Sequence, residues 1–237
     1  MSNILWQRLG AASGIVYVAV LLGADLIQGG PNEEETTMTA AEAIAHSCAI
    51  TTAAQPTDAV IPILTILGYL FFLFFLGSLW SALRRAEGAD GWLSAAAFGG
   101  GLVSLAILFS GGAASVAAHS NACVGIDPQL WQVLHDFGGA AFLFSFFPFA
   151  VLLAASAVVA IRFGALPRWL GWMSAFVAVT LLIGGIAGID YAREDAGLPY
   201  LLFELWTVIT SIVLIRRAGK PLPTVSTAPT SRAIETG

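Results

Sequence analysis

Five ionisable side chains lie within or at the ends of long apolar segments, where they could bind a ligand or take part in a reaction. They are Asp25, His119, His135, Asp136 and Glu204. Ionisable groups inside a membrane are energetically costly, and they commonly mark functional sites. Glu204 precedes Arg216 by twelve residues, so a helix would place it about 18 Å from that arginine. Asp25 would lie about 25 Å from Arg8, closer to the opposite boundary of the membrane.

Three interpretations of these residues compete. In the first, they are interfacial groups, and Glu204 is a neutral or hydrogen-bonded structural residue. In the second, they line an outward-facing pocket for a lipid or small amphiphile, with Glu204 and His135 as its polar groups. In the third, His119, His135 and a carboxylate bind zinc or haem in an intramembrane enzyme. No known metal-ligand spacing supports the third interpretation, and the cofactor is unknown.

The composition of the chain indicates that these residues belong to a membrane protein. The chain of 237 residues is 57% hydrophobic and only 11% charged, with a mean hydropathy of +0.83. A soluble domain is about 45–50% apolar and about 25% charged. So few charges cannot cover a globular surface in water.

Six apolar segments are long enough to cross a bilayer, which takes roughly 20 helical residues. No alternating strand pattern occurs. The fold class is therefore all-α, a polytopic six-transmembrane-helix bundle. The predicted spans are Leu9–Ile27, Ala59–Leu83, Trp92–Ala118, Leu130–Phe163, Leu170–Ile189 and Pro199–Ile215.

Basic residues predict the orientation of the bundle. With both termini cytoplasmic, only Arg193 among the ten basic residues falls outside, in agreement with the positive-inside rule. The five ionisable residues above then all belong to the outer half. The basic residues on the cytoplasmic side are Arg8, Arg84, Arg85, Arg162, Arg168, Arg216, Arg217, Lys220 and Arg232.

The membrane domain is predicted to cover residues 1–217, including an outer loop at 28–57 that contains a short helix at Ala40–Ala49. Thr39 and Glu42 have the spacing of a capping box at the start of that helix. The proline-containing segment 218–237 has no apolar period, and we expect a disordered cytoplasmic tail.

The only two cysteines, Cys48 and Cys123, fall in the first and second outer loops. An oxidising compartment favours a structural disulfide between them over two free thiols. Such a bond would attach the loop helix to the end of the third span.

Several sequence motifs at the cytoplasmic turns occur together. They are FLGSL at 75–79, LRRAEG at 83–88, AFGGG at 97–101, LPRWLGW at 166–172 and LIRR at 214–217. With them, the chain resembles a group of uncharacterised actinobacterial six-helix integral membrane proteins, a domain of unknown function. The resemblance covers all six spans and implies a bacterial plasma-membrane bundle, but it assigns no catalytic residue.

These observations favour a binding or accessory protein of the bacterial inner membrane over an enzyme. The expected partners are membrane lipids and a membrane protein. Nucleic acid is not expected, because the net charge is −5 and the arginines are scattered. We expect the ligand between the first, fourth and sixth spans, with the metal- or haem-binding enzyme as the alternative.

Overall fold

The computed structural model describes residues 3–28, 39–52, 56–88, 91–191 and 197–218. The predicted tail at 218–237 lies outside these residues except for Ala218. The described chain forms seven α-helices and one short 3₁₀ helix. They are α1 (Asn3–Gln28), α2 (Ala40–Thr52), α3 (Pro56–Glu87), α4 (Trp92–Ser120), η2 (Ala122–Val124), α5 (Pro128–Phe163), α6 (Arg168–Tyr191) and α7 (Gly197–Arg217).

The predicted six-helix membrane bundle is confirmed. Six helices, namely α1, α3, α4, α5, α6 and α7, are long and apolar enough to cross a membrane. The described residues contain no strand. The helices extend a few residues beyond the predicted spans at most ends. α5 starts two residues earlier than predicted, because the Asp127 carboxylate accepts hydrogen bonds from Gln129 N (2.9 Å) and Leu130 N (3.1 Å) and caps the helix.

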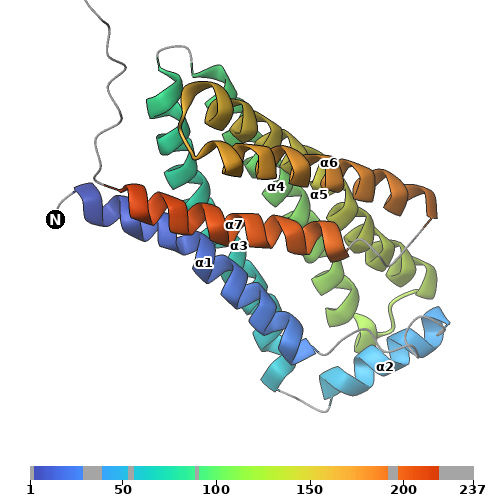
Figure 1. The fold of residues 1–237 in the computed structure, drawn as a ribbon. Helices are drawn as coiled ribbons and strands as arrows, with labels where there is room; N and C mark the ends of the chain where they lie inside the picture. Colours follow the sequence, from blue (N-terminus) through green and yellow to red (C-terminus); the bar gives the residue numbers. More distant parts are fainter. Residues whose placement is uncertain (1–2, 29–38, 53–55, 89–90, 192–196, 219–237) are drawn as a thin grey trace, which may run out of the picture.

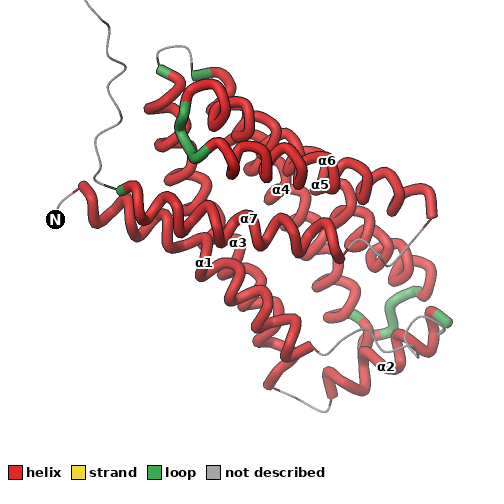
Figure 2. The backbone as a smooth tube through the Cα atoms, viewed as in Figure 1, coloured by secondary structure: helices red, strands yellow, loops and turns green. Residues whose placement is uncertain are grey.

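The helices form two sets that pack together. In one set α5 lies between α4 and α6, and in the other α1 packs against both α3 and α7 (Figure 1). Contacts between α3 and α4 and between α6 and α7 join the sets. The described loops lie at the two ends of the bundle (Figure 2). One end holds the start of α1 and the end of α7, and we call it the terminal end. The opposite end holds the helix α2, and we call it the α2 end.

Close helix packing between α4 and α5 depends on glycine. A Cβ added at Gly100 would lie 2.6 Å from the Pro148 carbonyl oxygen, and one at Gly111 would lie 2.6 Å from the Ala141 Cβ. Gly112, by contrast, has nothing within 4 Å of such a Cβ. Gly100 and Gly111 therefore serve the close packing of α4 against α5, whereas Gly112 does not.

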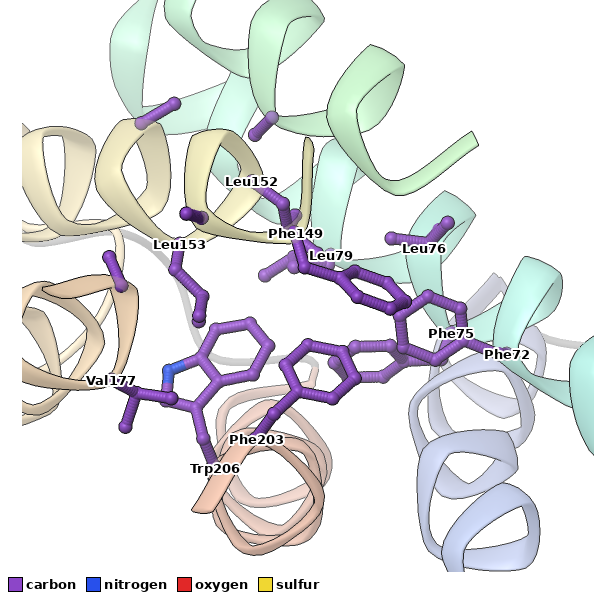
Figure 3. Close-up of a cluster of buried hydrophobic side chains, with 14 of the residues drawn as sticks. Phe72, Phe75, Leu76, Leu79, Phe149, Leu152, Leu153, Val177, Phe203 and Trp206 are labelled. Carbon is purple, nitrogen blue, oxygen red and sulfur yellow. The ribbon is translucent and has the colours of Figure 1, made fainter. Parts of the chain in front are cut away.

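An aromatic cluster fills the centre of the bundle, where the two sets of helices meet (Figure 3). Phe203 of α7 packs against Phe149 of α5 at 4.3 Å between ring centroids and against Phe72 of α3 at 5.7 Å. Trp206 Nε1 donates a hydrogen bond to Ser174 Oγ of α6 at 2.7 Å. Each of these rings is almost completely buried, so the middle of the bundle is closed.

The turns at the terminal end are held by side chains that bond to the backbone. The Glu87 carboxylate accepts hydrogen bonds from Leu93 N (2.9 Å) and Ser94 N (2.8 Å) at the start of α4. Arg217 donates to the Ala165 carbonyl at 2.8 Å in the α5–α6 turn. These charged groups therefore have a structural role.

The loop helix α2 confirms the predicted short helix and its capping box. Thr39 N donates to Glu42 Oε2 at 2.8 Å, and Glu42 N donates to Thr39 Oγ1 at 3.4 Å. The bonds from the Thr39 amide and hydroxyl lower the pKa of Glu42 below its usual value. α2 lies across one end of the bundle, against η2 and α5 (Figure 1).

Candidate functional site

Glu204 is the most deeply buried carboxyl group among the described residues. Its side chain lies on the buried face of α7 and is only 3% exposed. No described residue donates a hydrogen bond to its carboxyl group. Burial without a partner is costly for a polar group, and buried polar groups are normally bonded. The buried side-chain atoms without a partner in the described chain are Trp131 Nε1, Ser156 Oγ and Thr210 Oγ1, and the Glu204 oxygens are not among them.

Two tyrosine hydroxyls lie beside this carboxyl group. Tyr17 of α1 and Tyr200 of α7 share a hydrogen bond of 2.8 Å between their hydroxyl oxygens. Tyr200 precedes Glu204 by four residues, so both occupy one face of α7. Both tyrosines interact electrostatically with Glu204. The Tyr17–Tyr200 bond thus joins α1 to the face of α7 that carries Glu204.

Asp25 connects this group of residues to the α2 end. It is exposed near the end of α1 and interacts electrostatically with Glu204. It also interacts with Tyr69 of α3 and with Tyr200. We call Tyr17, Asp25, Tyr69, Tyr200 and Glu204 the polar cluster. The cluster brings together two of the five predicted site residues and combines groups from α1, α3 and α7.

Aromatic rings surround the polar cluster. The Tyr17 ring lies 4.8 Å from Phe72, and the Tyr200 ring lies 5.0 Å from Phe142, measured between centroids. Phe203 lies 6.0 Å from Tyr200 and continues into the central aromatic cluster of Figure 3. These rings separate the polar cluster from the terminal end.

The two predicted site histidines lie on the other set of helices, near the α2 end. Both pack against Trp131, with ring centroids at 6.4 Å for His119 and 5.0 Å for His135. Both are exposed, and His119 Nδ1 lies 2.8 Å from the Ser115 carbonyl oxygen. The indole Nε1 of Trp131 is buried without a hydrogen-bond partner. Among the described residues, neither histidine forms a hydrogen bond or a ring contact with Glu204.

Asp136, the remaining predicted site residue, is exposed on α5. Its carboxylate accepts a hydrogen bond from Gln132 Nε2 at 2.9 Å. Within the described ranges, no three or more His, Cys, Asp or Glu side chains are arranged to hold a metal ion. A shallow depression nearby is lined by Asn121, Val124, Gly125, Ile126, Leu130 and Leu134. Its lining is largely apolar and contains no ionisable group.

The two cysteines lie at the α2 end, at the distance of a disulfide. Their sulfur atoms are 2.08 Å apart and their Cα atoms 4.9 Å apart. Thr52 Oγ1 donates a hydrogen bond to the Cys48 carbonyl at 2.7 Å. As predicted, the pair joins the loop helix α2 to the segment after the third span.

The three tyrosines of the polar cluster were not identified from the sequence. Tyrosine is expected at membrane interfaces for structural reasons, so a phenol by itself gives little signal. The spacing of Tyr200 and Glu204 could have shown a shared helix face. The approach of Tyr17 and Tyr69 depends on helix packing, which the local sequence does not specify.

The chain was also compared with known proteins. No protein-family model matches it, and neither does any curated protein or solved structure. The geometry of its own residues therefore has to support any functional assignment.

Proposed function

We propose that this protein binds a lipid or small amphiphile at the polar cluster and acts as a binding or accessory component of a bacterial plasma membrane. The ligand's polar group would lie beside Glu204, and its apolar part would face the hydrocarbon.

The main observation in support is the burial of the ionisable residue Glu204 inside a membrane-spanning helix. The Glu204 residue as a whole is 3% exposed, so its side chain loses most of its hydration. A bound group that donates a hydrogen bond or carries a charge would offset this cost. In the bond between Tyr17 and Tyr200 one hydroxyl donates and the other accepts, so one phenolic hydrogen stays available to a second acceptor such as a ligand.

The distribution of charge supports access from the side opposite the cytoplasm. The arginines of α1, α3 and α7 all lie at the terminal end, which the positive-inside rule assigns to the cytoplasm. Asp25 lies at the opposite end and is exposed. The Cys48–Cys123 pair at that end fits an oxidising compartment. The ligand would thus enter past Asp25 in the outer half of the membrane.

The closed centre of the bundle favours binding over conduction. Phe72, Phe149, Phe203 and Trp206 are all buried, and they pack together between the two sets of helices (Figure 3). A water-filled pathway would need polar groups along its whole length. The polar cluster is therefore proposed as a binding site and not as part of a pathway across the membrane.

Native mass spectrometry of the purified protein tests this proposal. We expect a bound lipid or amphiphile on the wild-type protein and its loss from Glu204→Gln, which keeps the shape of the side chain but removes the charge. Asp127→Asn is the matched control, since asparagine caps a helix about as well as aspartate and the substitution also removes one negative charge.

Equal ligand retention in all three proteins, or no ligand on the wild type, would contradict the proposal. Metal analysis and a visible spectrum of the same sample test the metal- or haem-binding enzyme. A stoichiometric metal, or a Soret band, that is lost in both His119→Ala and His135→Ala would instead support a metal- or haem-binding site at these histidines of α4 and α5. A membrane-protein partner is tested by co-purification in mild detergent.

A further inference from the structure

The turn between α5 and α6, at the terminal end, brings together exposed arginines from three helices. Arg217 of α7 donates hydrogen bonds to the carbonyl oxygens of Gly164 (3.3 Å) and Ala165 (2.8 Å) in this turn. These bonds hold the end of α7 beside the residues where α5 ends and α6 begins. We call the four exposed arginines of this region the arginine cluster, namely Arg162, Arg168, Arg216 and Arg217.

No carboxylate of the described chain pairs with the arginine cluster. Within the described ranges, the side chains of Arg162, Arg168 and Arg216 form no hydrogen bond or ion pair. Glu87 is the only acidic residue described at the terminal end, and its carboxylate accepts hydrogen bonds from the first backbone amides of α4. The cluster therefore combines four positive charges with no described counter-charge.

The two arginines at the end of α3 lie at the same end of the bundle but differ from the cluster. Arg85 donates a hydrogen bond to Ser81 Oγ at 2.8 Å. The guanidinium carbon of Arg84 lies 5.8 Å from the centroid of the Trp80 ring. The positive-inside rule accounts for all of these arginines equally, so it does not explain why those of α3 have partners within the protein and most of the cluster has none.

Exposed aromatic side chains place the arginine cluster at the level of lipid head groups. Trp169 and Trp172 lie in the first two turns of α6 and are 55% and 67% exposed. Exposed tryptophans of membrane proteins prefer the boundary between hydrocarbon and water. The phosphates of the lipids lie at this boundary, and basic sites between helices bind anionic head groups there.

We propose that the arginine cluster binds the phosphate of an anionic phospholipid in the leaflet at the terminal end. Guanidinium groups donate paired hydrogen bonds to phosphate oxygens. Arg217 bonds to the turn through Nη1 alone, so its Nε and Nη2 keep donors for a ligand. The acyl chains would pack beside the exposed rings of Phe163 and Trp172. This site lies at the opposite end from Asp25 and does not depend on the proposed function.

The experiment titrates the full-length protein in a non-ionic detergent and measures bound lipid by native mass spectrometry. The probes are dioleoyl phosphatidylglycerol and dioleoyl phosphatidylcholine, which share their acyl chains, and inorganic phosphate. We expect phosphatidylglycerol to bind most tightly. Arg168→Gln should weaken its binding about fivefold, and Arg168→Gln/Arg216→Gln about twentyfold. Arg168→Gln should fold, because a helix is not destabilised by losing a cation from its first turn.

Arg85→Gln is the matched control, since it removes an exposed arginine from the same end of the protein but outside the cluster. It should leave the binding of phosphatidylglycerol unchanged. Equal weakening by Arg85→Gln and Arg168→Gln would show attraction to the whole charged surface and overturn the site.

The lipid probes supply two further outcomes. Equal binding of the two lipids would overturn the choice of an anionic ligand. Displacement of phosphatidylglycerol by an equal concentration of inorganic phosphate would retain the anion site and overturn the lipid. These results are separate from ligand retention in Glu204→Gln, so each proposal can fail without the other.

Discussion

The hydrogen bond between Tyr17 and Tyr200 joins α1 to α7 across 183 residues of chain. It fixes which face of each helix borders Glu204. The Tyr17 ring also packs on Phe72 of α3, so this residue links three helices. At the scale of single residues, the polar cluster therefore depends on a pair of phenols as well as on its carboxyl groups.

Substituting Tyr17 with phenylalanine tests this pair. The change keeps the ring, removes one hydroxyl and leaves the Tyr200 hydroxyl without its partner. We expect a loss in the free energy of unfolding of about 0.6 to 1.7 kcal/mol, the range measured for hydrogen bonds between membrane helices. Unfolding of the purified protein in mild detergent provides the measurement.

The control is the double variant Tyr17→Phe/Tyr200→Phe. Because both substitutions remove the same bond, the double variant should lose no more stability than the single variant. Losses that simply add would show that the two hydroxyls act separately.

Glu204 could be predicted as a deeply placed carboxyl group, because its distance from Arg216 fixes its depth in a helix. The helices that would pack around it could not. Asp25 and His119 were both expected near the ligand, but only Asp25 lies on the set of helices that carries Glu204, whereas His119 lies on α4 in the other set. Depth along a helix follows from the sequence, whereas the direction of a side chain around the helix axis depends on its packing partners.

At the scale of elements, the pairing of α4 with α5 rests on small residues that let the backbones approach. Gly111 faces Ala141, while the next residue, Gly112, faces open space. The two positions differ in environment but not in residue type, and they give a matched comparison.

Gly111→Ala should destabilise the bundle by about 1 to 3 kcal/mol, because its Cβ would lie 2.6 Å from that of Ala141. Gly112→Ala should be neutral or slightly stabilising, since alanine is the better helix former. Thermal unfolding of the two variants in one detergent compares them. Equal effects would show that α4 and α5 do not pack through Gly111.

The helices themselves were largely predictable, because apolar length and arginine-bounded turns define each span. The start of α5 was placed two residues late, since the prediction followed the apolar run rather than the Asp127 cap. The capping box of α2 was correctly predicted because Thr39 and Glu42 are local in sequence. Local signals thus determine the elements well.

At the scale of the whole molecule, the order of the helices in the chain does not determine which of them are neighbours. We expected the ligand between the first, fourth and sixth spans, yet the polar cluster takes Tyr69 from α3, the second span. The structure joins α1, α3 and α7 in one set and α4, α5 and α6 in the other (Figure 1). All six spans are apolar, so their hydropathy alone could not separate the two sets.

A structure of the wild-type protein in lipid nanodiscs, determined by electron cryo-microscopy, tests the central claim most directly. The account predicts non-protein density between α1, α3 and α7, within hydrogen-bonding distance of the Glu204 carboxyl group and extending past Asp25 toward the lipid. A Glu204 carboxyl group bonded to another part of the chain, with no density beside it, would contradict the account.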